Sequence, residues 1–142
     1  MTTASTNDNA QSGHRMPTYQ ALAHDIKNLG VECVFGLMSD DTALFATEID
    51  TIGIPFIGGR HENNAIAMAE GYSSTTGRLG IAIIGRGPAA ANGLHAAVSA
   101  SRTGSKVLII YGEMPVGGGA VNTIGPDYKA FNASGVLAAA GL

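Results

Sequence analysis

Two nearly continuous apolar segments constrain the fold of this chain more than any other feature. Residues 79–84 and 106–111 are dominated by Ile, Leu and Val, with no alternation of polar and apolar side chains. Strands of this kind are typical of a parallel sheet that is buried on both faces. The intervening residues 88–102 follow a helical pattern, and parallel strands need such a crossover connection. The sequence therefore predicts an α/β protein.

The same alternation extends toward the N-terminus. It predicts a helix from Pro17 to Leu29, a strand over residues 31–36, a helix capped by Asp40-Asp41-Thr42, a strand over residues 54–57 and a helix over residues 62–76. Regular alternation with short links predicts a doubly wound, mainly parallel sheet flanked by helices. The apolar residues 134–142 would expose apolar surface at a natural terminus, so we expect either a truncated domain or one subunit of a larger assembly.

Composition limits the classes of function. Residues 1–15 are polar and are expected to form a disordered leader, and residues 16–142 to form one domain. Charged residues make up 13% of the chain, about half the usual share, which predicts a surface partly covered by other protein. The net charge of −3 argues against a nucleic-acid partner. No apolar stretch reaches the roughly 18 residues of a membrane span. The single cysteine, Cys33, is expected to be a buried, inert thiol in a cytoplasmic protein.

The candidate site lies where the strands end. Ligands of doubly wound sheets bind beyond the carboxyl ends of the strands. Glu62 falls there, in Arg60-His61-Glu62, between an apolar strand and an alanine-rich helix. A carboxylate is seldom buried without a partner. Glu62 is therefore either a helix cap or a group that transfers a proton.

Other strand-end residues allow two interpretations each. Gly85-Arg86-Gly87-Pro88 is either a phosphate-binding loop or a tight turn, and Pro88 removes one of the N–H donors that a phosphate loop needs. Asn92 either faces solvent or contacts a ligand. Asp40 and Asp41 either cap the helix or face the crevice, where Glu113 is similarly placed.

The remaining polar and aromatic residues carry weaker expectations. The four histidines lack metal-ligand spacing, so no metal site is expected. His24 and His95 are expected to be ordinary surface residues, and His61 to support the site. Residues 117–119 form either a mobile loop or a point of close backbone approach. Tyr128 and Phe131 are expected to pack in the core.

Several motifs together resemble a known family. They are Arg60-His61-Glu62-Asn63-Asn64-Ala65, Ala69-Glu70-Gly71-Tyr72, Thr76-Gly77-Arg78 with Gly80, Gly87-Pro88 with Asn92, Val34-Phe35-Gly36 and Tyr111-Gly112. Their order and spacing over residues 16–142 resemble the N-terminal pyrimidine-binding domain of thiamine-diphosphate-dependent enzymes. The likeness is greatest to the group of acetolactate synthase, benzaldehyde lyase and the 2-oxo-acid decarboxylases.

The resemblance implies roles for particular residues. Glu62 would hydrogen-bond N1′ of the aminopyrimidine, favouring the imino tautomer whose 4′-nitrogen removes the C2 proton of the thiazolium. Gly87, Pro88 and Asn92 would line the pyrimidine. Asp40, His61 and Glu113 would lie toward the substrate, a weaker correspondence.

The chain also departs from the family pattern. Ala89 replaces a glycine, Arg86 a small residue, Ser39-Asp40 a glycine-rich turn, and Glu113 a glutamine that synthases often carry. The sequence lacks the Gly-Asp-Gly motif with which the family holds Mg²⁺, so a partner domain or subunit would supply the metal and bind the diphosphate.

The chain is expected to supply only half of an active site. The chain would act in a homo- or hetero-oligomer as part of a lyase or transferase that decarboxylates or carboligates 2-oxo acids, and would be inactive alone. Two alternatives are a non-catalytic binding or assembly module of the same fold, and a Rossmann-like nucleotide-binding domain.

Overall fold

The computed structural model describes residues 15–113 and 129–142. Strands and helices alternate along the chain, as the sequence predicts. The elements are α1 (Thr18–Asn28), β1 (Val34–Gly36), α2 (Ala43–Thr51), β2 (Phe56–Gly58), α3 (Glu62–Thr76), β3 (Gly80–Ile84), α4 (Ala89–Asn92), α5 (Leu94–Thr103), β4 (Val107–Tyr111) and α6 (Ala133–Ala139).

The four strands form one parallel sheet in the order β2-β1-β3-β4. Residues Gly80 to Ile84 of β3 pair with Val107 to Tyr111 of β4, and Phe35 of β1 lies opposite Ala82. Every residue of β3 is buried, because this strand has neighbours on both edges and helices on both faces. The prediction of a parallel sheet flanked by helices is confirmed.

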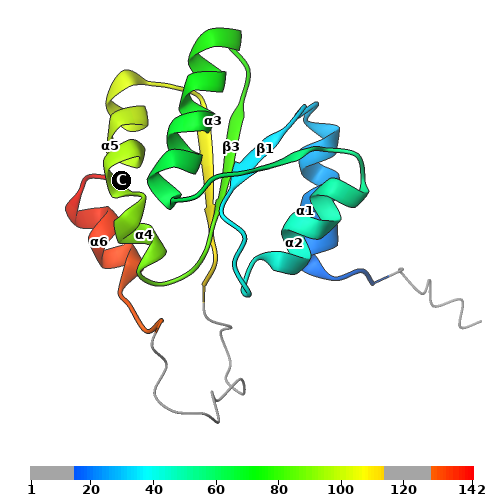
Figure 1. Ribbon diagram of the computed structural model, residues 1–142, viewed down its shortest axis with the longest axis horizontal. Coiled ribbons are helices and arrows are strands. Elements are labelled where there is room, and N and C mark those ends of the chain that lie inside the picture. Colours follow the sequence, from blue (N-terminus) through cyan, green and yellow to red (C-terminus); the bar gives the residue numbers. More distant parts are fainter. Residues whose placement is uncertain (1–14, 114–128) are drawn as a thin grey trace, which may run out of the picture.

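Two helical layers enclose the sheet (Figure 1). Helices α1 and α2 cover one face, where large aliphatic side chains such as Ile26, Ile49 and Ile83 form the core. Helices α3, α4 and α5 lie on the other face together with α6, and the core there is rich in alanine. Short side chains allow α3 to pack closely on β3. At Gly80 the approach is closest, since a Cβ on this residue would overlap the backbone carbonyl of Ala69.

Strands β1 and β2 begin later than the sequence predicts. Residues 31–33 precede β1, and Ile54 lies in the turn that ends α2, where its N–H donates to the carbonyl of Ile49 at 3.0 Å. The N–H of Val34 donates to the carbonyl of Pro55 at 3.0 Å, so the pairing of β1 with β2 starts there. The early start predicted for β2 arises because Ile54 is buried although it lies in a turn, whereas residues 31–33 before β1 are only partly buried or exposed.

The helix predicted over residues 88–102 is divided at Gly93 into α4 and α5. The N–H of Ala96 donates to Oδ1 of Asn63 in α3 at 2.8 Å, in place of the carbonyl four residues earlier. Glycine is also a poor helix former. A side chain from a neighbouring helix thus completes the start of α5, which periodicity along one segment cannot reveal.

Some single-residue predictions are also corrected. Cys33 is partly buried rather than buried, and that burial raises the pKa of its thiol. Phe131 is 39% exposed rather than packed in the core. Residues 1–14, the glycines at 117–119 and Tyr128 lie outside the described residues.

Candidate functional site

A crevice of about 340 Å³ lies where the strand order reverses. The chain runs from β1 to β2 on one side and later returns to β3 on the other side of β1. The segment after β1 leads to α2 on one face of the sheet and the segment after β3 leads to α4 on the other face, so these two connections diverge there (Figure 1). Open α/β sheets bind ligands at such points. The crevice is lined by Leu37, Met38, Ser39, Asp40, Glu62, Gly85, Arg86, Pro88, Ala89, Asn92 and Lys129.

Glu62 enters the crevice from the first turn of α3. The helix begins after His61, whose extended backbone makes it the N-cap and whose Nδ1 accepts the N–H of Asn63 at 3.2 Å. A carboxylate is favoured in this first turn because the helix dipole is positive there. The His61 side chain thus has a structural role at the helix start, and His61 is not among the residues that line the crevice.

Asn92 and Glu62 form a hydrogen-bonded pair in the crevice. Nδ2 of Asn92 donates to Oε2 of Glu62 at 3.1 Å, and Asn92 is the hydrogen-bond partner that the described residues provide for this carboxylate. Gly93, which follows Asn92, packs closely against the same helix: a Cβ on it would lie 2.6 Å from Cδ1 of Ile66 in α3. The structure therefore brings together two residues that the sequence singles out separately.

The Gly85–Pro88 segment forms a tight turn from β3 into α4. Gly87 has a φ of +69°, which favours glycine, and its N-terminal neighbours Gly85 and Arg86 line the crevice with Pro88. Gly87 itself is buried behind this wall, against the backbone of Lys129.

Asp41 makes contacts that the sequence does not indicate. Within the predicted cap Asp40-Asp41-Thr42, Thr42 is the N-cap of α2 and its hydroxyl donates to the carbonyl of Ser39, so neither Asp40 nor Asp41 caps the helix. Asp41 instead turns inward. Its Oδ2 accepts the N–H of Arg86 at 2.6 Å, and its Oδ1 accepts hydrogen bonds from Ser39 and, at 2.9 Å, from Lys129.

These contacts determine the charge state of Asp41. Burial of the carboxyl opposes ionisation, but hydrogen bonds from Ser39, Lys129 and the Arg86 N–H outweigh it and hold the pKa of Asp41 well below its ordinary value. Hydrogen bonds to Asp40 and Asp41 in turn raise the pKa of Lys129. Lys129 carries no motif in the sequence, and only the fold brings it within reach of residues almost ninety positions away.

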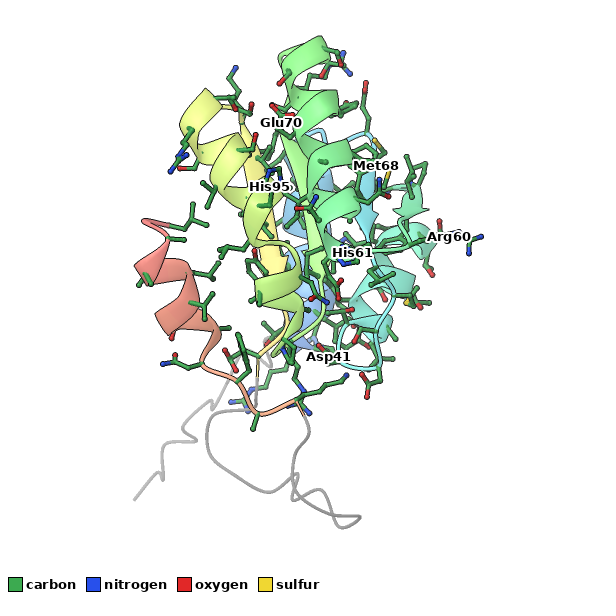
Figure 2. All side chains as sticks on the ribbon, turned by 60° about the vertical axis from the view of Figure 1, so that its left-hand side comes forward. Asp41, Arg60, His61, Met68, Glu70 and His95 are labelled. Atoms are coloured by element: carbon green, nitrogen blue, oxygen red, sulfur yellow. The ribbon has the colours of Figure 1, made fainter. Side chains whose placement is uncertain are left out.

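Of the other predicted residues, Asp40 lines the crevice and Glu113 does not. The Asp40 side chain is 74% exposed and pairs with Lys129 at the edge of the crevice. Glu113 is exposed beyond β4 and is not among the lining residues. Figure 2 shows Asp41 near the end of the molecule where the strand-end segments meet, whereas Arg60 points outward.

Across 15–113 and 129–142, His, Cys, Asp and Glu form no group of three or more that is suited to a metal ion. Within those ranges, no helix has both the length and the apolar character of a membrane span.

The fold and the crevice define an α/β ligand-binding domain with a carboxylate at its switch point. Residues 16–132 match the family described as thiamine pyrophosphate enzyme, N-terminal TPP binding domain. The chain belongs to this family, which confirms the resemblance seen in the sequence. This membership argues against the alternative of a Rossmann-like nucleotide-binding domain.

Two curated relatives match part of this chain. The acetolactate synthase large subunit of Haemophilus influenzae is 31% identical over 96 residues, which are 67% of this chain and 17% of that protein. A Pseudomonas aeruginosa protein named "Probable 2-ketoarginine decarboxylase AruI" is 34% identical over 73 residues, 51% of this chain and 13% of that protein. This chain thus spans only 17% and 13% of the length of these two curated relatives.

A solved structure supports the fold. The Rhodococcus jostii RHA1 thiamine diphosphate-dependent 4-hydroxybenzoylformate decarboxylase superposes with a TM-score of 0.62 at 20% identity, covering 69% of this chain and 19% of that one.

Proposed function

We propose that the crevice binds the aminopyrimidine ring of thiamine diphosphate and that Glu62 hydrogen-bonds N1′ of that ring. The Glu62–Asn92 pair carries this proposal. It places a carboxylate and an amide side by side in a crevice whose other walls include the apolar side chains of Leu37, Met38 and Ala89. A flat heteroaromatic ring suits a site with apolar walls and a few polar groups that fix its orientation.

Glu62 would hold a proton at N1′. Asn92 donates to Oε2, and that contact fixes the direction of the carboxyl group while the other oxygen, Oε1, is left for the ring nitrogen. Positioned proton transfer of this kind contributes roughly 10²- to 10⁴-fold to catalysis. When bound, thiamine diphosphate supplies the electron sink for breaking or forming a carbon–carbon bond next to a carbonyl.

A partner would complete the site. We propose that a diphosphate-binding domain or subunit holds Mg²⁺ and the diphosphate, in a homo- or hetero-oligomer, and that the isolated chain is inactive. The chain matches only 17% and 13% of the length of the two relatives, which supports a separate domain or subunit for the diphosphate. The substrate would be a 2-oxo acid that is decarboxylated or carboligated, as the names of the two relatives suggest.

Binding of the ring alone tests the first part of the proposal. The ¹⁵N-labelled chain is titrated with 4-amino-2-methylpyrimidine, and the side-chain amide signal of Asn92 is followed by NMR. We expect this signal to shift, and Glu62→Gln to weaken binding roughly tenfold or more, because a hydrogen bond to a charged group contributes about 1.5–3 kcal/mol. Glu48→Gln, on the opposite face of the sheet, is the control and should leave the affinity unchanged.

Catalysis tests the second part. The chain is mixed with a diphosphate-binding domain of the family, thiamine diphosphate, Mg²⁺ and pyruvate, and pyruvate consumption is measured. We expect turnover by the mixture, none by the chain alone, and a loss of roughly 10²-fold or more for Glu62→Gln. An active mixture that Glu62→Gln leaves unimpaired would contradict the proposed role.

A further inference from the structure

We infer that Asp41, paired with Lys129, is a positioning residue for the Asn92–Glu62 pair and acts through the backbone of Arg86. The importance of Asp41 for catalysis rests on the role proposed for Glu62. The coupling between the Asp41–Arg86 contact and the Asn92–Glu62 pair does not depend on that role. Neither Asp41 nor Lys129 touches the Glu62–Asn92 pair in the hydrogen bonds described above.

The Asp41 carboxylate has little freedom. Its side chain is only 13% exposed, and that of Lys129 15%, whereas Asp40 next to it is 74% exposed. Both Asp41 oxygens accept hydrogen bonds, Oδ1 from Ser39 and Lys129, and Oδ2 from Arg86. Asp41 thus connects the segment after β1, the segment after β3 and the residues that precede α6.

The backbone of three glycines packs closely against this cluster. A Cβ on Gly112 would overlap Oδ2 of Asp41, and one on Gly85 would lie 2.9 Å from Oγ of Ser39. A Cβ on Gly87 would overlap the carbonyl of Lys129. Three glycines at the ends of β3 and β4 therefore let the backbone close tightly around Asp41 and Lys129.

A short, ordered path leads from Asp41 to Asn92. Arg86 lies three residues before the four-residue helix α4, and Asn92 is the last residue of that helix. Along this path the N–H of Ala90 donates to Gly87 at 3.1 Å and that of Asn92 donates to Pro88 at 3.1 Å. A shift of the Arg86 backbone is thus transmitted to the Asn92 amide, whose bond to Glu62 depends on its position.

The test measures this coupling in the 142-residue chain without any cofactor. In Asp41→Asn, we expect the backbone amide signal of Arg86 to move, together with the side-chain amide signal of Asn92 and the carboxyl ¹³C signal of Glu62. Lys129→Met should move the same three signals, and Lys129→Arg, which keeps the ion pair, should restore them. Asp50→Asn, an exposed carboxylate on α2, is the matched control and should leave all three in place.

Two results would overturn the inference. One is a shifted Arg86 signal while the Asn92 and Glu62 signals coincide with those of the unaltered chain. The other is an equal response to Asp50→Asn. If Asp41→Asn does not fold, Ser39→Ala removes one hydrogen bond to the same carboxylate and is held to the same criteria.

Turnover separates this inference from the proposed function. In the reconstituted mixture Asp41→Asn should lower kcat roughly tenfold to a hundredfold with KM for pyruvate little changed, since misplacement by about 1 Å can cost about 10²-fold. If Glu62→Gln leaves turnover intact while the three signals still respond to Asp41→Asn, the proposed function fails and the coupling stands. If Glu62→Gln abolishes turnover while the Asn92 signal does not change in Asp41→Asn, the coupling is refuted and the proposed function stands.

Discussion

Gly93 and Ile66 meet with no room for one further carbon atom. A Cβ on Gly93 would lie 2.6 Å from Cδ1 of Ile66, which is fully buried between α3 and the sheet. A side chain at residue 93 would therefore press against Ile66 where the junction of α4 with α5 meets α3. This junction directly follows Asn92, whose amide donates to the carboxylate of Glu62.

Gly93→Ala is expected to destabilise the chain by about 1–3 kcal/mol, because overpacking a core outweighs the gain of roughly 1 kcal/mol in helix propensity. Ile66→Val removes Cδ1 and should cost about 0.5–1.5 kcal/mol alone. Urea unfolding of both single variants and the double variant measures their interaction. The double variant should lose less free energy of unfolding than the two single variants lose together. Additive losses would show that residue 93 and Cδ1 of Ile66 do not interact.

Asp41→Asn should destabilise the chain in a pH-dependent manner. The pKa of Asp41 is lowered in the folded state, so its ionised form stabilises the fold fully above the ordinary aspartate pKa of about 3.9, and this contribution disappears as the pH falls further. We expect a loss of about 2 kcal/mol at neutral pH, shrinking below about pH 4. Urea unfolding at several pH values measures it, and Asp50→Asn should show no such trend.

Gly80→Ala should be among the most damaging single substitutions. The added Cβ would overlap the carbonyl of Ala69, a backbone atom in the middle of α3, so relief requires moving the helix away from β3. We expect a cost of about 3 kcal/mol or more, at the upper end for overpacking. Gly58→Ala on strand β2 is the control, since its Cβ would have no described atom within 4 Å. Thermal unfolding of both variants should separate them clearly, and equal midpoints would refute the close packing.

Asn63→Ala removes the acceptor for the N–H of Ala96 at the start of α5. An unsatisfied, largely buried donor costs about 1–3 kcal/mol. Amide hydrogen exchange should become faster at Ala96 and its neighbours, with less change in β3. Asn64→Ala, at the adjacent and exposed position, should not accelerate exchange there.

The sheet could be predicted from the sequence because burial on both faces leaves a direct record in residues 79–84 and 106–111. The break at Gly93 could not, since its cause is an amide on α3, more than thirty positions away along the chain. The sequence predicts the start of β2 too early for a related reason: Ile54 is buried in a turn, and burial alone does not distinguish a turn from a strand.

The candidate site could likewise be predicted only in part from the sequence. Glu62 and Asn92 stand out because polar side chains among alanines at strand ends have few packing roles, and the fold does place them in contact. Asp41 follows Asp40 in an ordinary capping pattern, and nothing local distinguishes the exposed carboxylate from the inward one. Lys129 was missed altogether, because its role depends on contacts that only the folded chain creates.

The contacts of Asp41 also bear on the order of events in folding. Its bonds to Arg86 and Lys129 join residues 45 and 88 positions apart, whereas Asn92 and Glu62 are 30 apart. Closing longer loops costs more chain entropy before any contact compensates for it, so long-range contacts slow folding. We therefore expect the α3–β3–α5 region to nucleate and the wall built on Asp41 to form after the transition state. Substitutions at Asp41 and Lys129 would then accelerate unfolding while leaving the folding rate almost unchanged.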